Sequence, residues 1–332
     1  MRVGGRNWGR CVSVALLLSL GACRQREEPP KAAAPAPAPV QPAAAPTPPV
    51  ERAAGDAALV ERGRYLAESV LGCVGCHTAR DYSRYGGPLS GPMLAGACYG
   101  EEWEMPGTLC APNITSDPEH GVGRWTDTEL LRTLREGYGR DGRTLFPMMP
   151  YMEWRTLSDG DARAVVAWLR TVPAVAKATP PSSLPAEVTA DIKDLAAPLP
   201  GPVPEPGSDP VARGAYLAAL AQCAFCHTSG DDPPKPFAGG RTAPTPYGGE
   251  RVPSLLPDGP VMKGLSEDAF IARFAVFKDL GHAPSRKGQL NKLAMPWASL
   301  ATMKDADLRA VYRYLRTQGG PPSEAPRRAS GP

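Results

Sequence analysis

Apolar side chains recur at helical spacing in two parts of the chain. Residues 62–73 place their apolar positions on one helical face. Residues 158–171 open with Ser158 and Asp161 at the separation of a capping box, and their apolar side chains then follow at helical intervals. No stretch of useful length alternates between apolar and polar positions, as a half-buried strand would. The pattern therefore predicts an all-α fold.

Both patterns return in the second half of the chain. Residues 62–78 match residues 213–228 with a single one-residue gap, and residues 149–171 match residues 295–317 without a gap. In each copy the second element follows the first at a similar interval. Such self-similarity is typical of a repeated structural unit, so we expect two small all-helical domains in tandem.

One more helix is expected in each copy. In the first it covers residues 127–136, because Thr126 and Glu129 stand at the separation of a capping box. Its counterpart follows Ser266, where Ala269 replaces the acidic partner. Each unit is therefore expected to contain at least three helices.

Proline divides the chain into segments. Residues 27–50 are nearly all Pro, Ala and charged residues, which cannot bury a core and favour extended polyproline II conformations. A second Pro-rich stretch separates the two repeats. The expected organisation is a leader (1–22), a disordered Pro/Ala-rich tether (23–56), a first domain (57–178), a Pro-rich linker (179–208), a second domain (209–320) and a disordered tail (321–332).

The first residues have the order of a secretory signal, with arginines, then an apolar run, then small residues. Its end, Leu20–Cys23, resembles a bacterial lipobox, so we expect Cys23 to become the lipidated first residue. Cleavage nearby by an ordinary signal peptidase is the alternative. The expected location is the periplasmic side of a bacterial membrane, reached through a lipid anchor.

Charge argues against a nucleic-acid partner. The net charge of +3 comes from three arginines in residues 1–22, and the rest of the chain has 34 basic and 34 acidic residues. A balanced chain lacks the basic field that nucleic acid or an anionic membrane would require.

Half of the eight cysteines and half of the four histidines lie in two clusters, "CVGCH" (Cys73–His77) and "CAFCH" (Cys223–His227). C-x-x-C-H is the attachment signature of haem c. Two cysteines one helical turn apart can form thioethers with the haem vinyl groups, and the next histidine can bind the iron. We therefore expect two covalently bound haem c groups, held by Cys73, Cys76 and His77 and by Cys223, Cys226 and His227.

Two other interpretations fit the clusters less well. Paired C-x-x-C zinc ribbons usually lie about 15–20 residues apart, whereas these clusters fall in separate repeats. A thioredoxin-type dithiol expects a βαβ context, which the chain does not offer.

Each iron needs a sixth ligand or an open position. Met149 and Met295 coincide in the repeat alignment, and each is followed by proline and an aromatic residue. Proline stiffens the loop that would carry the thioether, so these two methionines are the expected distal ligands. Met148 is the leading alternative in the first repeat. The remaining candidates are Met152 and His120 in the first repeat, and Met262, Met303 and His282 in the second.

Cys98 and Cys110 are left over once the leader and haem cysteines are set aside. In an exported protein they are expected to form a disulfide that closes a surface loop, with two free thiols as the alternative. The glycosylation sequon at Asn113 is interpreted as a chance match.

With these motifs in place, residues 111–130 and 141–154 of the first repeat resemble the class I cytochrome c superfamily. The resemblance is closest to the multihaem cytochrome subunits of periplasmic alcohol, aldehyde and sugar-acid dehydrogenases. It covers residues 57–175 well and 209–318 more loosely. It implies thioether bonds from the cysteine pairs, proximal ligation by His77 and His227, and distal ligation by Met149 and Met295. Those subunits generally carry three haem domains, whereas this chain has two.

The leading functional hypothesis is a membrane-tethered dihaem electron carrier that is not itself an enzyme. It would relay single electrons from a periplasmic dehydrogenase or quinol oxidase to a later acceptor such as a terminal oxidase. His/Met ligation suits this role because it closes the coordination sphere. A dihaem peroxidase or thiosulfate-oxidising cytochrome is the enzymatic alternative. A redox sensor or a structural component of an oxidase complex is a third.

Overall fold

The computed structural model describes residues 57–84, 86–278 and 294–319. The expectations for the leader, Cys23, the Pro/Ala-rich tether, His282 and the last residues lie outside this part of the chain. Both repeats belong to one unit, Arg52–Pro332.

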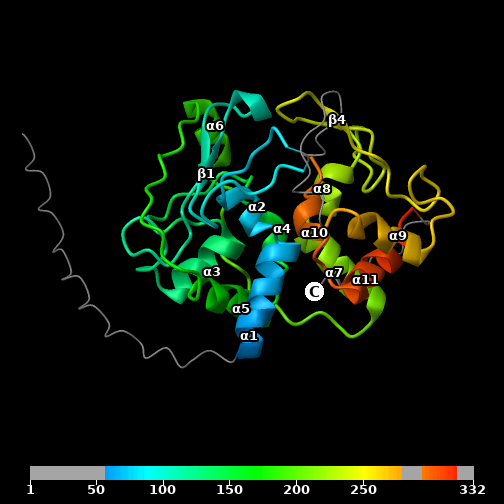
Figure 1. Ribbon diagram of the computed structural model, residues 1–332, viewed down its shortest axis with the longest axis horizontal. Helices are drawn as coiled ribbons and strands as arrows, with labels where there is room; N and C mark the ends of the chain where they lie inside the picture. Colours follow the sequence, from blue (N-terminus) through cyan, green and yellow to red (C-terminus); the bar gives the residue numbers. More distant parts are fainter. Residues whose placement is uncertain (1–56, 85, 279–293, 320–332) are drawn as a thin grey trace, which may run out of the picture. The chain divides into compact units, whose positions relative to one another are not determined.

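Helices follow one another in the same order in both repeats (Figure 1). The first repeat contains α1 (Ala57–Tyr65), the π-helical turn η1 (Leu66–Val70), α2 (Cys73–His77), α3 (Asp127–Glu136), α4 (Tyr151–Trp154) and α5 (Asp159–Leu169). The second contains α7 (Pro210–Leu220), α8 (Cys223–His227), α9 (Glu267–Ala275), α10 (Trp297–Leu300) and α11 (Asp305–Arg316). Helix α3 has the bounds predicted from its capping box, in which Thr126 and Glu129 accept each other's backbone N–H groups.

The first and last helices of each repeat cross at a glycine. Helix α1 packs on α5, and α7 packs on α11. A Cβ atom added to Gly63 would lie 1.8 Å from the carbonyl oxygen of Ala164, and one added to Gly214 would lie 1.9 Å from that of Ala310. Both separations are far inside van der Waals contact. Only glycine therefore allows the two helix backbones to approach so closely.

The two repeats share one hydrophobic core. Buried Leu66 and Trp154 of the first repeat belong to the same cluster of contacting side chains as Leu217 and Leu308 of the second. Burial of apolar side chains is the main favourable contribution to folding. The repeats therefore stabilise each other and do not fold around separate cores.

Two short antiparallel ribbons correct the all-α prediction. Strand β1 (Ala97–Tyr99) pairs with β2 (Leu109–Ala111), and β3 (Thr242–Ala243) pairs with β4 (Glu250–Arg251). Segments of two or three residues are too short to show an alternating pattern in the sequence. The described chain is mainly helical, with one such ribbon in each repeat.

The Pro-rich stretch between the repeats lies against the first repeat. It contains helix α6 (Ala186–Ile192). Ser183 pairs in antiparallel fashion with Thr108, the Tyr138 hydroxyl donates to the carbonyl of Ala196 at 3.1 Å, and the N–H of Asp159 donates to Val203 at 2.9 Å. Extended proline-rich backbone has no internal hydrogen bonds, so its carbonyls are free to accept such contacts. The stretch is thus more than a spacer.

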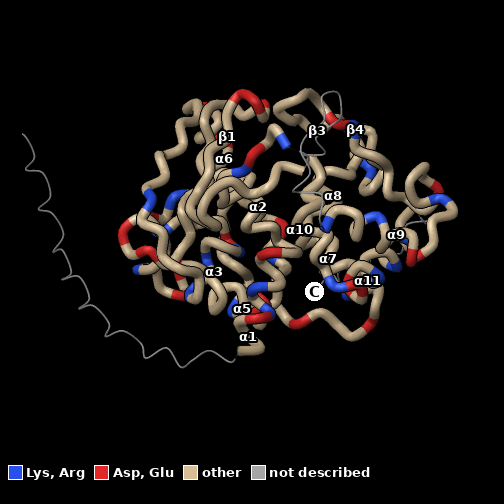
Figure 2. Tube along the Cα trace, viewed as in Figure 1, with Lys and Arg blue, Asp and Glu red and all other residues tan. Residues whose placement is uncertain are grey.

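Basic and acidic side chains are interspersed over both repeats (Figure 2). Among the described residues, no helix has the length and apolar character needed to cross a bilayer.

One carboxylate departs from the sequence expectation. Ser158 accepts the N–H of Asp161 at 3.1 Å, as a capping box requires. The Asp161 carboxylate is buried and binds Arg62 instead of the Ser158 N–H, with a 2.7 Å contact. Only half of the predicted capping box therefore forms.

The helix crossings give a matched test of the fold. Gly63→Ala and Gly214→Ala should each destabilise the protein by at least about 1–3 kcal/mol, because the new methyl group forces the crossing helices apart. Guanidinium unfolding followed by far-UV circular dichroism measures the change. Gly201→Ala is the control, since a Cβ atom there meets nothing within 4 Å, and it should stay within about 0.5 kcal/mol of the wild type. Equal stability in all three variants would contradict the tight crossing.

Candidate functional site

The two C-x-x-C-H segments form matching one-turn helices, α2 and α8. The residue before each helix has a left-handed backbone, with φ 68° at Gly72 and φ 58° at Gln222. Glycine adopts this conformation readily, whereas glutamine does so at a cost. The same local backbone therefore forms at both clusters although the sequences before them differ.

Each cluster histidine is oriented by a carbonyl group. The Nδ1 atom of His77 lies 2.7 Å from the Pro112 oxygen, and that of His227 lies 2.7 Å from the Pro253 oxygen. A carbonyl oxygen can only accept, so Nδ1 carries the proton and Nε2 keeps a free lone pair. Burial lowers the pKa of both imidazoles, which favours the neutral form. This is the arrangement of a metal-binding histidine fixed by a hydrogen bond to its second nitrogen.

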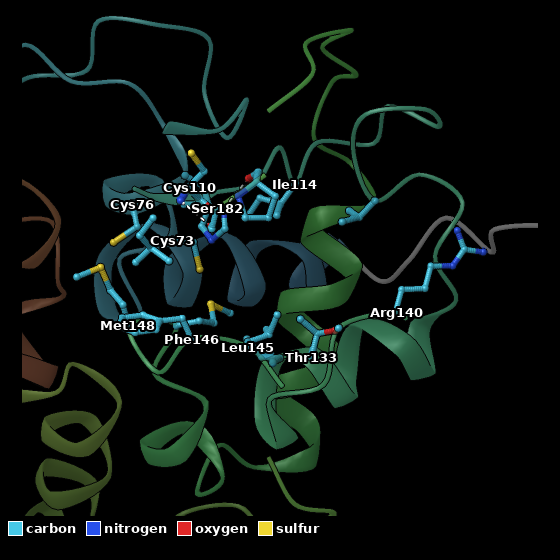
Figure 3. A pocket seen from close by; sticks show the side chains of 18 of the residues that line it. Cys73, Cys76, Cys110, Ile114, Thr133, Arg140, Leu145, Phe146, Met148 and Ser182 are labelled. Atoms are coloured by element: carbon cyan, nitrogen blue, oxygen red, sulfur yellow. Dashed lines mark hydrogen bonds between the residues drawn. The ribbon is translucent and has the colours of Figure 1, made fainter. Parts of the chain in front are cut away.

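A cavity of about 1510 Å³ lies beside helix α2. Ordinary small-molecule pockets measure about 300–1,000 Å³, so this one is large. Cys73, Cys76 and His77 line it together with many apolar side chains. In Figure 3, Cys73, Cys76 and Met148 lie at one end of the cavity and Arg140 at the other. The size and lining fit a large, mainly apolar cofactor attached through two thiols and an imidazole.

The described residues do not offer a conventional metal cluster. Within residues 57–84, 86–278 and 294–319, no group of three or more His, Cys, Asp or Glu side chains is placed to hold a metal ion. Burial raises the pKa of the Cys73 and Cys223 thiols to about 12, so both are protonated where zinc would need thiolates. The haem interpretation fits this donor set better than the zinc interpretation.

Met149 and Met295 occupy equivalent places in the two repeats. The carbonyl of Met149 accepts the N–H of Tyr151, and that of Met295 accepts the N–H of Trp297, both at 2.8 Å. Both methionines are half-buried and pack against the core. Met148 also lines the cavity but is 40% exposed. The structure thus brings two methionines to the first cavity and distinguishes them by burial.

The other methionines and His120 have different surroundings. Met262 and Met303 are fully enclosed in the core, and Met152 is 46% exposed. His120 lines the first cavity, and its Nδ1 lies 3.3 Å from the Asp117 carboxylate. None of these four residues has an equivalent role in the other repeat.

Asn113 is a residue whose role the sequence did not reveal. Its side chain is buried, and Nδ2 donates to the carbonyls of Val175 and Lys177 at 2.8 and 2.9 Å. Its Oδ1 accepts the backbone N–H of Thr115 at 2.9 Å. These bonds fix the loop that begins with Pro112, the residue whose carbonyl orients His77. An amide in the middle of a polar loop is the available signal, but in the sequence alone it coincides with a chance sequon.

The Pro-rich stretch and the disulfide complete the wall of the first cavity. Cys98 and Cys110, the expected pair, are joined by a disulfide. The N–H of Cys110 donates to the hydroxyl of Ser182 at 2.9 Å, and Cys110, Ser182 and Ser183 all line the cavity. The contribution of the stretch after Thr179 could not be predicted from its composition.

Comparisons with known proteins agree with this site. Residues 60–173 match the family model for cytochrome c. The chain is 33% identical over 285 residues to the cytochrome c subunit of a quinone alcohol dehydrogenase of Gluconobacter oxydans (strain 621H), covering 80% of this chain and 56% of that protein. It is 28% identical to the cytochrome c subunit of a gluconate 2-dehydrogenase of Pantoea cypripedii, covering 79% and 60%. It is also 28% identical to a diheme cytochrome c-type protein of Cereibacter sphaeroides, covering 74% and 81%.

The chain spans about half the length of most of the curated relatives it matches, and less than that of a nicotinate dehydrogenase component of Pseudomonas putida, of which it covers 22%. The similarity therefore concerns the cytochrome portion of these proteins.

Asn113 provides a test of how the His77 loop is held. Asn113→Ala removes both donations to the Val175–Lys177 segment and should speed amide exchange at Thr115 and Val175 by roughly tenfold or more, as loss of buried hydrogen bonds costs about 1–3 kcal/mol. Hydrogen–deuterium exchange followed by NMR measures it. Thr189→Ala, which removes an exposed hydroxyl bonded to Ala186, serves as the control. Unchanged exchange in Asn113→Ala would show that the loop is held by other contacts.

Proposed function

Because the chain belongs to the cytochrome c family, we propose that it is a dihaem c-type cytochrome that relays single electrons and is not an enzyme. The observation that carries this proposal is the pair of equivalent C-x-x-C-H helices, each with a neutral histidine held through Nδ1. A single site of this kind suits one haem, and the repetition suits two.

The residues of each site have separable tasks. The two cysteines of each helix attach the cofactor covalently, and the histidine presents Nε2 to the iron. When bound, haem supplies a one-electron iron couple. In the first repeat the apolar lining around Cys73 and His77 keeps water away from the cofactor, which favours the less charged reduced state.

We propose Met149 and Met295 as the distal ligands. Their support is the equivalent backbone around the two Met-Pro elements and the half-buried position of both side chains. Thioether ligation raises the potential and closes the coordination sphere. A closed sphere suits electron transfer better than peroxidase or thiosulfate-oxidising chemistry, which requires an open or labile position.

The partner and the location follow from the relatives and from the sequence. The relatives include cytochrome c subunits of alcohol, gluconate and fructose dehydrogenases, so we propose a periplasmic dehydrogenase, or a quinol oxidase, as electron donor and a terminal oxidase as a later acceptor. The signal-like leader and Cys23 support attachment through lipid at the periplasmic side of a membrane. The balanced charge gives no reason to expect nucleic acid.

Haem content is the first test. The protein purified from a host that matures c-type cytochromes should carry two haems that survive denaturation, because thioether bonds are covalent. Haem staining after denaturing electrophoresis, together with intact mass, measures the number. Cys223→Ser/Cys226→Ser should reduce it to one. Release of all the haem into acidic acetone would refute covalent attachment.

The distal ligands are the second test. The oxidised protein should show the weak long-wavelength Met–Fe(III) absorption of two haems, and Met149→Ala or Met295→Ala should each remove about half of it and let one reduced iron bind carbon monoxide. Met148→Ala is the matched control and should leave the band intact. Loss of the first-repeat share in Met148→Ala but not in Met149→Ala would assign the ligand to Met148. Ready binding of carbon monoxide by the wild type would favour an enzyme.

A further inference from the structure

The contacts between the two repeats are reciprocal. The Tyr65 hydroxyl of the first repeat donates to the Asp307 carboxylate of the second at 2.5 Å. The Tyr216 hydroxyl of the second repeat donates to the Asp161 carboxylate of the first at 2.8 Å. In the repeat alignment Tyr65 corresponds to Tyr216, and Asp161 corresponds to Asp307. Such exchange of equivalent contacts is the signature of an isologous interface, here formed within one chain.

Each of these carboxylates is buried and doubly bonded. Asp161 is 5% exposed and binds Arg62 of its own repeat, and Asp307 is 2% exposed and binds Arg213 of its own repeat. The arginine compensates the buried charge, and the tyrosine of the other repeat occupies a remaining acceptor position.

The tyrosine hydroxyls also accept backbone N–H groups at equivalent places. Ser158 donates to Tyr216 at 3.2 Å, and Lys304 donates to Tyr65 at 3.3 Å. Burial raises the pKa of both phenols, so each remains a protonated donor. Hydrogen bonds to charged groups are stronger than those between neutral groups, which makes these two tyrosines the most specific polar contacts of the interface.

The same interface adjoins both cysteine clusters. Trp154, which lines the first cavity, donates its Nε1–H to the carbonyl of Leu220 at 2.9 Å, three residues before Cys223. Gln222, the residue next to Cys223, itself lines the first cavity. On the other side, the hydroxyl of Ser69, four residues before Cys73, lies 2.8 Å from that of Thr302. The segments that carry the two clusters therefore meet across the interface.

We infer that Tyr65 and Tyr216 are positioning residues that lock the two haem sites of the proposed cytochrome into one rigid unit, so that an electron passes directly between them within the chain. In this step one haem site loses the electron that the other gains, with no bond or proton changed. The inference rests on the proposed function and adds to it that the two sites exchange electrons within one molecule, without an encounter between two molecules.

The first arm of the test measures opening of the interface. In the double variant Tyr65→Phe/Tyr216→Phe the rings remain and only the hydroxyls are lost, so the repeats should fold and the indole Nε1–H of Trp154 should exchange with solvent roughly tenfold faster or more. Tyr312→Phe is the matched control, since its hydroxyl donates at 2.7 Å to Leu265 within the second repeat. Exchange at Trp154 within about twofold of the wild type in the double variant would overturn the inference.

The second arm measures electron exchange between the sites. After one electron is injected by flash photoreduction, the wild type should redistribute it in a first-order step whose rate does not depend on protein concentration. Tyr216→Glu places a second carboxylate against Asp161 and should slow that step by roughly tenfold or more, since like charges in contact are strongly unfavourable. Haem content and full chemical reduction, measured on the same samples, should stay at two per chain.

The two hypotheses fail in different ways. Redistribution that scales with protein concentration in the wild type, with two reducible haems present, would overturn the rigid unit and leave the proposed function intact. Fewer than two reducible haems in the wild type would overturn the proposed function and the inference together.

Discussion

The hydrogen bond from each cluster histidine to a proline carbonyl is the contact on which the proposed sites depend. It fixes the proton on Nδ1 of His77 and His227 and leaves Nε2 unprotonated on a buried ring. Without it the imidazole could rotate or protonate, and the cysteines alone would not set the geometry at iron. The surrounding loops serve this bond, since Asn113 holds the loop that supplies Pro112.

The two repeats have the same helices but unequal surroundings. In the first, the Cys98–Cys110 disulfide and Ser182 of the Pro-rich stretch build one wall of the cavity. In the described part of the second repeat, the ribbon β3–β4 has no disulfide. Differences in the protein around a haem shift its potential through burial and hydrogen bonding. The duplication therefore provides two sites of one kind that need not have one potential.

Much of the fold and the site could be predicted from local sequence patterns. The capping box at Thr126, the repeated clusters, the Met-Pro elements and the pairing of Cys98 with Cys110 all depend on residues near one another in sequence or on arithmetic of rare residues. The rest depends on long-range contacts that leave no local trace. The acceptor of the Tyr65 hydroxyl lies 242 residues away, and the Pro-rich stretch is ordered by hydrogen bonds to the first repeat that its composition does not encode. Strands of two or three residues carry no periodicity.

The central claim is that this chain holds two haem sites that each carry one electron. Spectroelectrochemical titration with coulometry tests it directly on the purified full chain. The account predicts two electrons taken up per chain, in reversible one-electron steps that give the same spectra in the oxidative and reductive directions. Uptake of a single electron per chain, or a cooperative two-electron step, would contradict it.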